Sequence, residues 1–168
     1  AHAAAAALLT YAEHTQGRSL PHVQRVQVQR SDALIDLPAS TRRNLELTQT
    51  LRGESAANSP TLFALLDTCM TGMGSRLLKS WLLSPPRDRQ AAVDRLQAQA
   101  VLRGESGAGA WSGLREQLKG ASDVERITAR TALRQVRPRE LVALRQALAR
   151  AASLSLQLQT LNPEPGTL

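Results

Sequence analysis

The stretch TGMGSRLLKSWL, residues 71–82, contains two glycines, a hydroxyl group ahead of a cation and a second cation, which are ingredients of phosphate-binding loops. A P-loop requires a glycine, four residues and then Gly-Lys followed by Ser or Thr, after a buried strand. Here Gly74 is followed by Ser75-Arg76, and the preceding residues 62–69 have helical periodicity, so both requirements fail. The stretch instead predicts a helix capped by Thr71.

The predicted helix over 71–82 carries a glycine on its apolar face, where Gly74 lies among Met70, Met73, Leu77 and Trp81. Glycine costs about 1 kcal/mol relative to alanine inside a helix. We therefore expect Gly74 to permit close backbone approach by a neighbouring element. The substitution Gly74→Val is expected to lower thermal stability by overpacking.

Composition and length favour one mainly α-helical domain, built as an irregular helical bundle. The chain has 168 residues and a hydrophobic fraction of 42%, supplied mainly by Leu, Ala and Val because aromatic residues make up only 2%. Leu and Ala favour helices, whereas sheets favour aromatic and β-branched residues.

Capping and stop signals predict further helices at 3–15 before Gly17, at 59–69 with Ser59 as cap and Pro60 in the first turn, at 88–104, at 114–120, from a capping box at Ser122-Asp123-Val124-Glu125, and from Pro138.

A small β element is expected near the N-terminus. Val26 and Val28 alternate with glutamines, and Ser31-Asp32 supplies turn chemistry ahead of an apolar segment at 33–35. This pattern predicts an antiparallel hairpin at about 22–37. After Pro38, a helical turn through 41–44 is predicted to lead into a short strand at 45–48.

The net charge of +7 is concentrated in the second half of the chain, where residues 61–168 carry fifteen Lys and Arg against nine Asp and Glu. Such a field attracts a phosphate backbone or an acidic partner, and it also suits an ordinary soluble surface in an Arg-rich proteome. The arginines at 134, 137, 139, 145 and 150 are candidates for nucleic-acid contact. Because aromatic side chains for base stacking are scarce, backbone contact is expected rather than base reading.

Catalytic and metal sites are not indicated by the residue pattern. Cys69 is the single cysteine, which excludes an internal disulfide and a multi-thiolate metal site and favours a reducing compartment. His2, His14 and His22 match no zinc spacing, and no nucleophile-elbow motif occurs. No segment has the roughly 18 consecutive apolar residues of a membrane span. The opening at Ala1, without Met or a signal-peptide pattern, indicates a piece excised from a longer chain.

Several short motifs follow one another in a fixed order: YAEHTQ at 11–16, TRRNLEL at 41–47, LLDT at 65–68, MGSRLLKSWL at 73–82, PPRD at 85–88, DRL at 94–96, DVER at 123–126 and RPREL at 137–141. As an ordered set they resemble the MutS family of bacterial DNA mismatch repair proteins. The resemblance runs from about residue 5 to about residue 154. It implies the C-terminal helix of a connector domain at 1–16, the first part of a core, or lever, domain at 17–161, and a truncated or disordered tail at 162–168.

The resemblance implies a structural role, in which stiff helices transmit conformational change between mismatch-binding and clamp regions and an ABC-type ATPase. The family's Phe-x-Glu mismatch motif and its nucleotide motif are absent from the chain. We therefore expect no enzymatic activity and no bound cofactor here, with ATP and Mg belonging to the complete protein. The implied partners are the remaining MutS domains, mismatched duplex DNA and a MutL-type protein, in a cytoplasmic homodimer or tetramer without membrane contact.

The residues that the resemblance nominates are structural, and the junction from Arg42 to Leu47 is the expected hinge. The structural and hinge candidates are Arg42, Arg43, Asn44, Leu47, Gly74, Arg76, Trp81, Asp123 and Arg126. The candidates for contact with the DNA backbone are Arg137, Arg139 and Arg150.

A second interpretation, from a different class, is an autonomous basic helical module that binds duplex DNA through the phosphate backbone. It predicts a duplex affinity that falls steeply with salt concentration. An enzymatic interpretation predicts nucleotide hydrolysis by this chain alone, and we expect none.

Overall fold

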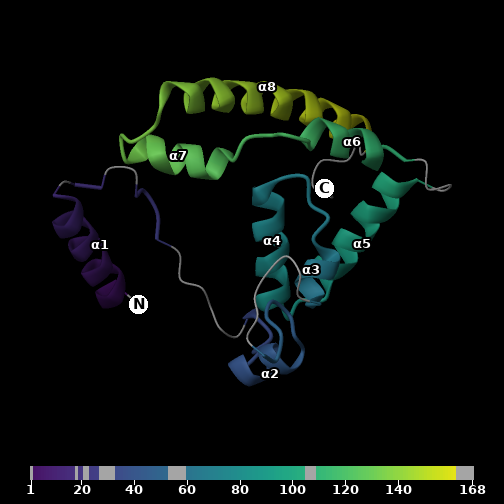
Figure 1. Ribbon diagram of the computed structural model, residues 1–168, viewed down its shortest axis with the longest axis horizontal. Helices are drawn as coiled ribbons and strands as arrows, with labels where there is room; N and C mark the ends of the chain where they lie inside the picture. The colour runs from purple at the N-terminus through teal and green to yellow at the C-terminus, as the bar shows by residue number, and fades with distance from the viewer. Residues whose placement is uncertain are drawn as a thin grey trace. The chain divides into compact units, whose positions relative to one another are not determined.

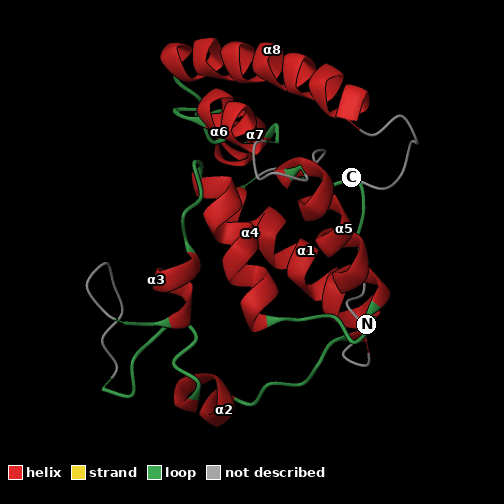
Figure 2. Ribbon diagram, turned by 90° about the vertical axis from the view of Figure 1, so that its right-hand side faces the viewer, coloured by secondary structure: helices red, strands yellow, loops and turns green. Residues whose placement is uncertain are grey.

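The computed structural model describes residues 2–17, 19–20, 23–26, 33–52, 60–104 and 109–161. Within these ranges the chain forms helices and no strand, as the uniformly red elements of Figure 2 show. It divides into two compact units, Ala1–Ser31 and Asp32–Leu168. The helices are labelled in Figure 1: α1 (His2–Gln16), α2 (Ala39–Asn44), α3 (Leu62–Leu66), α4 (Gly72–Leu83), α5 (Gln90–Arg103), α6 (Trp111–Leu118), α7 (Val124–Ala132) and α8 (Pro138–Leu161).

The first unit contains α1, which ends at its predicted stop signal. Gly17 adopts a left-handed φ of 62°, and its N–H donates a hydrogen bond of 3.3 Å to the carbonyl oxygen of His14. Glycine takes this conformation without a Cβ clash, so it ends a helix readily. The side chains of α1 are not buried.

The predicted hairpin at 22–37 is wrong where the structure describes it. Residues 23–26 form no strand, and residues 27–32, where the turn was expected, lie outside the described ranges. The segment 33–35 pairs instead with the chain just after α4. Leu34 and Pro86 form an isolated antiparallel bridge, Ile35 N–H donates to the carbonyl oxygen of Pro85 at 2.9 Å, and Arg87 N–H donates to that of Ala33 at 3.0 Å. Because prolines at 85 and 86 offer no N–H groups, the pairing stays a single bridge.

The predicted strand at 45–48 is also wrong, because the chain turns there. Leu45 is the C-cap of α2, and Glu46 has a left-handed φ of 47°, which an extended strand does not accommodate. The N–H groups of Leu62 and Phe63 donate to the carbonyl oxygens of Glu46 and Leu47 at 3.1 and 2.9 Å. The turn is thereby fastened to the start of α3.

Helix α3 begins later than predicted and is only five residues long. Its N-cap is Thr61, whose side-chain oxygen accepts a hydrogen bond of 3.1 Å from Ala64 N–H, and Pro60 precedes the helix. Ser59, the predicted cap, lies outside the described residues. The residue that starts the helix is therefore a buried threonine, 4% exposed, whose hydroxyl satisfies a free helix N–H.

The predicted cap of α4 and the predicted stop residues of α5 and α6 are confirmed, whereas α6 begins at Trp111, ahead of the predicted start at residue 114. Thr71 caps α4 by accepting a hydrogen bond of 3.0 Å from Gly74 N–H. Helix α5 stops at Gly104, with a φ of 69°, and α6 stops just ahead of Gly120, with a φ of 68°. The positive φ at both glycines explains why these residues end the helices.

Helices α7 and α8 form a helical hairpin whose second member opens at Pro138 as predicted. Asp123, and not Ser122, is the N-cap of α7: its carboxylate accepts a hydrogen bond of 3.0 Å from Arg126 N–H. Helix α8 has 24 residues, a length of about 36 Å. It packs along both α6 and α7, as Figure 1 shows.

The buried apolar core is thin over the described residues. Leu20 is buried in the first unit, and Leu47, Ile127 and Ala147 are buried in the second, whereas large side chains such as Leu96 and Leu156 are 63% and 65% exposed. Burying a leucine is worth about 1.5 to 3 kcal/mol, so these exposed faces contribute little to stability. The relative positions of the helices therefore depend more on specific polar contacts than they would in a protein with a larger buried core.

Candidate functional site

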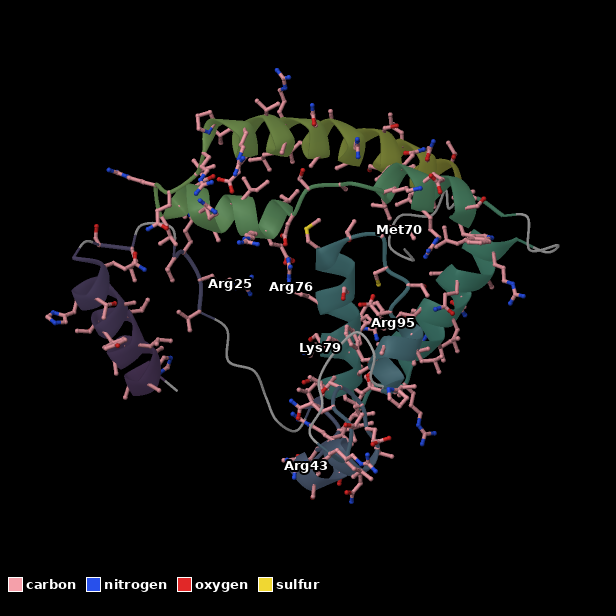
Figure 3. The ribbon with its side chains drawn as sticks, viewed as in Figure 1. Arg25, Arg43, Met70, Arg76, Lys79 and Arg95 are labelled. Carbon is pink, nitrogen blue, oxygen red and sulfur yellow. The ribbon has the colours of Figure 1, made fainter. Side chains whose placement is uncertain are left out.

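The guanidinium of Arg76 joins α4 to the start of α7. Its Nη1 lies 2.7 Å from Asp123 Oδ2, and its Nη2 lies 2.9 Å from Asp123 Oδ1 and 2.7 Å from Glu125 Oε2. Figure 3 labels Arg76, in the part of α4 nearest to α7. We name these three residues the Arg76 clasp. A two-point guanidinium–carboxylate contact sets orientation as well as distance.

Asp123 has two tasks in the clasp, because the carboxylate that binds Arg76 also caps α7. The hydrogen bonds from Arg76 hold the pKa of Asp123 below its ordinary value, with a further contribution from the N–H of Arg126 and from both positive charges. The same contacts raise the pKa of Arg76, first through Asp123 and then through Glu125. Arg76 and Asp123 are therefore both charged at neutral pH. Glu125 occupies the first turn of α7, where the helix dipole favours an anion.

The first turn of α4, from which Arg76 projects, is held by a second set of polar contacts. Ser75 Oγ donates to Asp67 Oδ2 at 2.5 Å, and Asp67 Oδ1 accepts a hydrogen bond of 3.3 Å from Cys69 N–H. The hydrogen bond from Ser75 is the main reason that the pKa of Asp67 is lowered, while burial raises the pKa of the Cys69 thiol. Asp67 thus connects the α3–α4 link to the helix.

Gly74 lies against this link, in the same first turn. A Cβ built on Gly74 would lie 3.2 Å from Thr71 Oγ1 and 3.4 Å from Cys69 Cβ. The close neighbours are side chains from just ahead of α4. We expected the backbone of another element to approach Gly74, and this expectation is wrong. The atoms nearest to Gly74 belong to the side chains of Thr71, which caps α4, and of Cys69.

Trp81 lies at the other end of α4 and meets α5. The guanidinium carbon of Arg95 lies 3.9 Å from the centroid of the Trp81 ring. Lys79 Nζ lies 5.9 Å from the centroid of Phe63, toward α3; Figure 3 labels both cations. A cation over an aromatic face is attracted by about 0.5 to 1 kcal/mol when exposed. Helix α4 is thus connected by its side chains to α3, α5 and α7.

The family model for MutS domain III matches residues 40–167 of the chain. The chain belongs to the MutS family. It is therefore a MutS-like DNA mismatch repair protein, and family membership implies other MutS domains and DNA as partners. The match begins after the first compact unit, Ala1–Ser31. The assignment of residues 1–16 to a connector domain stays a prediction.

In this MutS domain III, the turn between α7 and α8 is closed by an ion pair. Arg130 Nη1 lies 3.3 Å from Glu140 Oε1, and Arg130 Nη2 donates to the carbonyl oxygen of Gln135 at 2.9 Å. Glu140 Oε2 accepts a hydrogen bond of 2.7 Å from Arg137 N–H, ahead of α8. Both charged side chains are less than one third exposed. The angle between α7 and α8 is thereby restrained.

The nominated residues of MutS domain III fall into separate groups. Arg42, Arg43 and Asn44 line one hollow of about 680 Å³ beside α2. Leu47 is buried in the adjoining turn. Arg150 Nη1, on α8, donates to the carbonyl oxygen of Lys119 at 3.2 Å. Arg126, Arg137 and Arg139 share a different hollow with Asp123.

Sequence reasoning nominated Arg76, Trp81 and Asp123 but missed three further residues that hold α4 against its surroundings. Glu125, Arg95 and Asp67 were not nominated. Glu125 carried a usable signal, since it follows the cap of α7 by two residues and so places a second carboxylate at the same helix start. Arg95 and Asp67 belong to the DRL and LLDT motifs, but neither motif indicates the contact with Trp81 or with Ser75 that the structure shows.

The part of the chain that the structure describes contains neither a candidate metal site nor a candidate membrane span. Among those residues, no group of three or more His, Cys, Asp and Glu is placed to hold a metal ion. Among the helices of this MutS domain III that are described, none combines the length and apolar character that a membrane span needs.

Proposed function

We propose that this chain is the lever of a MutS-family mismatch repair protein, which passes conformational change between DNA-binding regions and the ATPase of the complete protein. The observation that carries the proposal is the Arg76 clasp. It links two helices whose contacting residues are 47 positions apart in the sequence, and it does so through charges. Charged contacts at a surface break and re-form without leaving a cavity, which suits an element with two arrangements.

A continuous set of contacts supports the transmission. Helix α8 is long, the Arg130–Glu140 pair restrains it against α7, and the clasp joins α7 to α4. The contact of Arg95 with Trp81 continues from α4 to α5. Energetic coupling between distant sites travels through such packed and hydrogen-bonded networks. The turn at Arg42 to Leu47 is the proposed hinge, since Glu46 already holds a left-handed conformation there.

The test is the substitution Arg76→Met in the complete mismatch repair protein. Methionine keeps much of the side-chain length but removes the ion pairs. Three quantities are measured: affinity for a mismatched duplex without nucleotide, the ATP hydrolysis rate, and the rate of ATP-induced release from the duplex. We expect the duplex affinity and the ATP hydrolysis rate to be retained. The rate of ATP-induced release is expected to fall about fivefold or more, because the coupling energy between the two sites is lost.

The matched control is Arg103→Met, which removes an exposed arginine at the end of α5 that has no ion-pair partner among the described residues. It is expected to leave all three quantities unchanged. Arg76→Lys is expected to restore release only in part, because an ammonium cannot make the two-point contact. An Arg76→Met protein with normal ATP-induced release would reject the lever proposal.

The remaining functional assignments are part of the same proposal. ATP, Mg and hydrolysis are assigned to other regions of the complete protein, so the purified chain is expected to release no phosphate from ATP. A MutL-type partner, a dimer or tetramer and a cytoplasmic location are proposed from the family alone. Independent duplex binding is less favoured, since Arg150 already donates to a carbonyl oxygen within the chain.

A further inference from the structure

A shallow hollow of about 630 Å³ lies between α7 and α8, and arginines dominate its lining. We name it the arginine hollow. The charged residues that line it are Asp123, Arg126, Arg130, Arg137, Arg139 and Glu140. Four cations therefore face two anions, and both helices of the hairpin contribute.

The two carboxylates of the arginine hollow are already engaged. Asp123 binds Arg76, which lies outside the lining, and Glu140 binds Arg130. The charge of Arg126 also acts on Asp123 and contributes to its lowered pKa, but neither carboxylate forms an ion pair with Arg126, Arg137 or Arg139. A charge that is paired at less than 3.5 Å contributes little to the field farther away.

The guanidiniums of Arg126, Arg137 and Arg139 have no hydrogen-bond or ion-pair partner among the described residues. Arg130 adds a buried Nε that also lacks a partner within the described ranges. A buried N–H without a partner costs about 1 to 3 kcal/mol. One hollow thus gathers three free guanidiniums and an unsatisfied donor.

We propose that the arginine hollow binds a compact phosphate group, with Arg126, Arg137 and Arg139 as the donors. Guanidinium forks match the oxygens of both carboxylates and phosphates. Three forks around one hollow suit an anion with more than two oxygens and more than one charge, which a phosphate offers and a single carboxylate does not. The inference does not depend on the lever role, because it concerns binding by this chain.

The placement of the other arginines favours a compact anion. Arg145 and Arg150 on α8 do not line the hollow. Three unpaired guanidiniums of the hairpin, those of Arg126, Arg137 and Arg139, are nevertheless gathered in one hollow, whereas an extended polyanion is usually bound along a line of contacts. The phosphate can come from a nucleic acid, in which neighbouring phosphodiesters of the backbone together supply more than two oxygens and more than one charge, or from a small phosphate-bearing molecule. The experiment separates these sources.

The experiment titrates pyrophosphate into the chain by isothermal calorimetry at constant chloride concentration. The hollow variant is Arg126→Gln/Arg139→Gln, and the control is Arg103→Gln/Arg145→Gln, which removes the same formal charge elsewhere. We expect the hollow variant to bind pyrophosphate about tenfold or more weakly than the native chain and the control to bind normally. Circular dichroism establishes that both variants keep their helix content.

A second readout locates the bound anion. Amide resonances of residues 123–140 are expected to shift as pyrophosphate is added, while those of α4 and α5 stay in place. Undetectable pyrophosphate binding, or equal weakening in the two variants, would overturn the proposal, since a diffuse positive field predicts equal weakening.

A parallel titration with a short DNA duplex identifies the source of the phosphate. If the hollow variant alone also loses duplex affinity, the natural ligand is the phosphodiester backbone. If duplex binding is the same in both variants while pyrophosphate binding differs, the ligand is a small phosphate-bearing molecule. Either result presupposes the selective loss of pyrophosphate binding, so it supports the site.

Discussion

Arg76 and Asp123 meet through two nitrogen–oxygen contacts of 2.7 and 2.9 Å, and the same carboxylate of Asp123 caps α7 through Arg126 N–H at 3.0 Å. One side chain therefore serves a local task and a tertiary one. The start of α7 and its attachment to α4 depend on the same charge. This shared dependence makes Asp123 a more sensitive position than its partial exposure suggests.

Removing the cation of the clasp is expected to lower the thermal midpoint of this chain. Arg76→Met deletes the contacts to Asp123 and Glu125. Because the side chains of Arg76 and Glu125 are more than half exposed, the decrease is expected to be small and to shrink as salt is added. Thermal unfolding by circular dichroism at low and high salt measures it. An equal decrease for Arg103→Met, or no salt dependence, would contradict this explanation.

The clasp is also expected to make stability depend on pH below neutrality. The pKa of Asp123 is lowered in the folded chain, chiefly by Arg76. A lowered folded-state pKa means that the stabilisation is present above the unfolded value of about 3.9 and is lost as the pH falls through the lower folded value. Asp123→Asn, which retains a good capping residue, should be less stable than the native chain at neutral pH.

The difference between the Asp123→Asn variant and the native chain should shrink on acidification. Urea midpoints measured from pH 7 down to about pH 2 test this, because both proteins carry an uncharged residue 123 at the lowest values. Asp67, whose pKa is also lowered, is present in both and cancels in the comparison. A difference that stays constant over the whole range would show that the charge of Asp123 is irrelevant.

The residues that cap and terminate helices could be predicted from the sequence, but the contacts between distant segments could not. Thr71, Pro138 and the terminating glycines act within one or two turns, so their neighbours in the sequence determine what they do. The alternation at 26–29 and the turn residues Ser31-Asp32 predict a hairpin that includes 33–35, but these signals do not identify the segment with which 33–35 pairs. The true partner, 85–87, follows helices α2, α3 and α4 in the sequence.

The residues of the Arg76 clasp could be predicted in part, but the contact between them could not. Arg76 and Asp123 belonged to recognisable motifs, yet nothing in either motif required the two side chains to touch. The Ser-x-x-Glu pattern predicts Ser122 as the cap, but Glu125 forms an ion pair with Arg76 instead of closing a capping box. A tertiary ion pair thereby overrode a local rule.

Gly74 and Gly113 form a matched pair for testing close packing. Both lie inside helices, but a Cβ on Gly74 would meet Thr71 at 3.2 Å, whereas a Cβ on Gly113 meets nothing within 4 Å. Gly74→Val is expected to destabilise the chain by about 1 to 3 kcal/mol through overpacking. Gly113→Val should have almost no effect or a slightly favourable one. Chemical denaturation of both variants measures the difference, and equal effects would refute the packing role of Gly74.

Arg134 offers a stabilising change at the end of α7. Its φ of 55° is left-handed, its N–H donates to the carbonyl oxygen of Thr131 at 2.9 Å, and Gln135 N–H donates to that of Arg130 at 2.9 Å. These paired bonds form a Schellman motif, whose left-handed position favours glycine. Arg134→Gly should therefore raise the free energy of unfolding by about 0.5 to 1 kcal/mol, because it removes a Cβ clash. Arg145→Gly, inside α8, should lower it by about 1 kcal/mol. Urea unfolding that shows both substitutions to be destabilising would mean that the turn does not carry this strain.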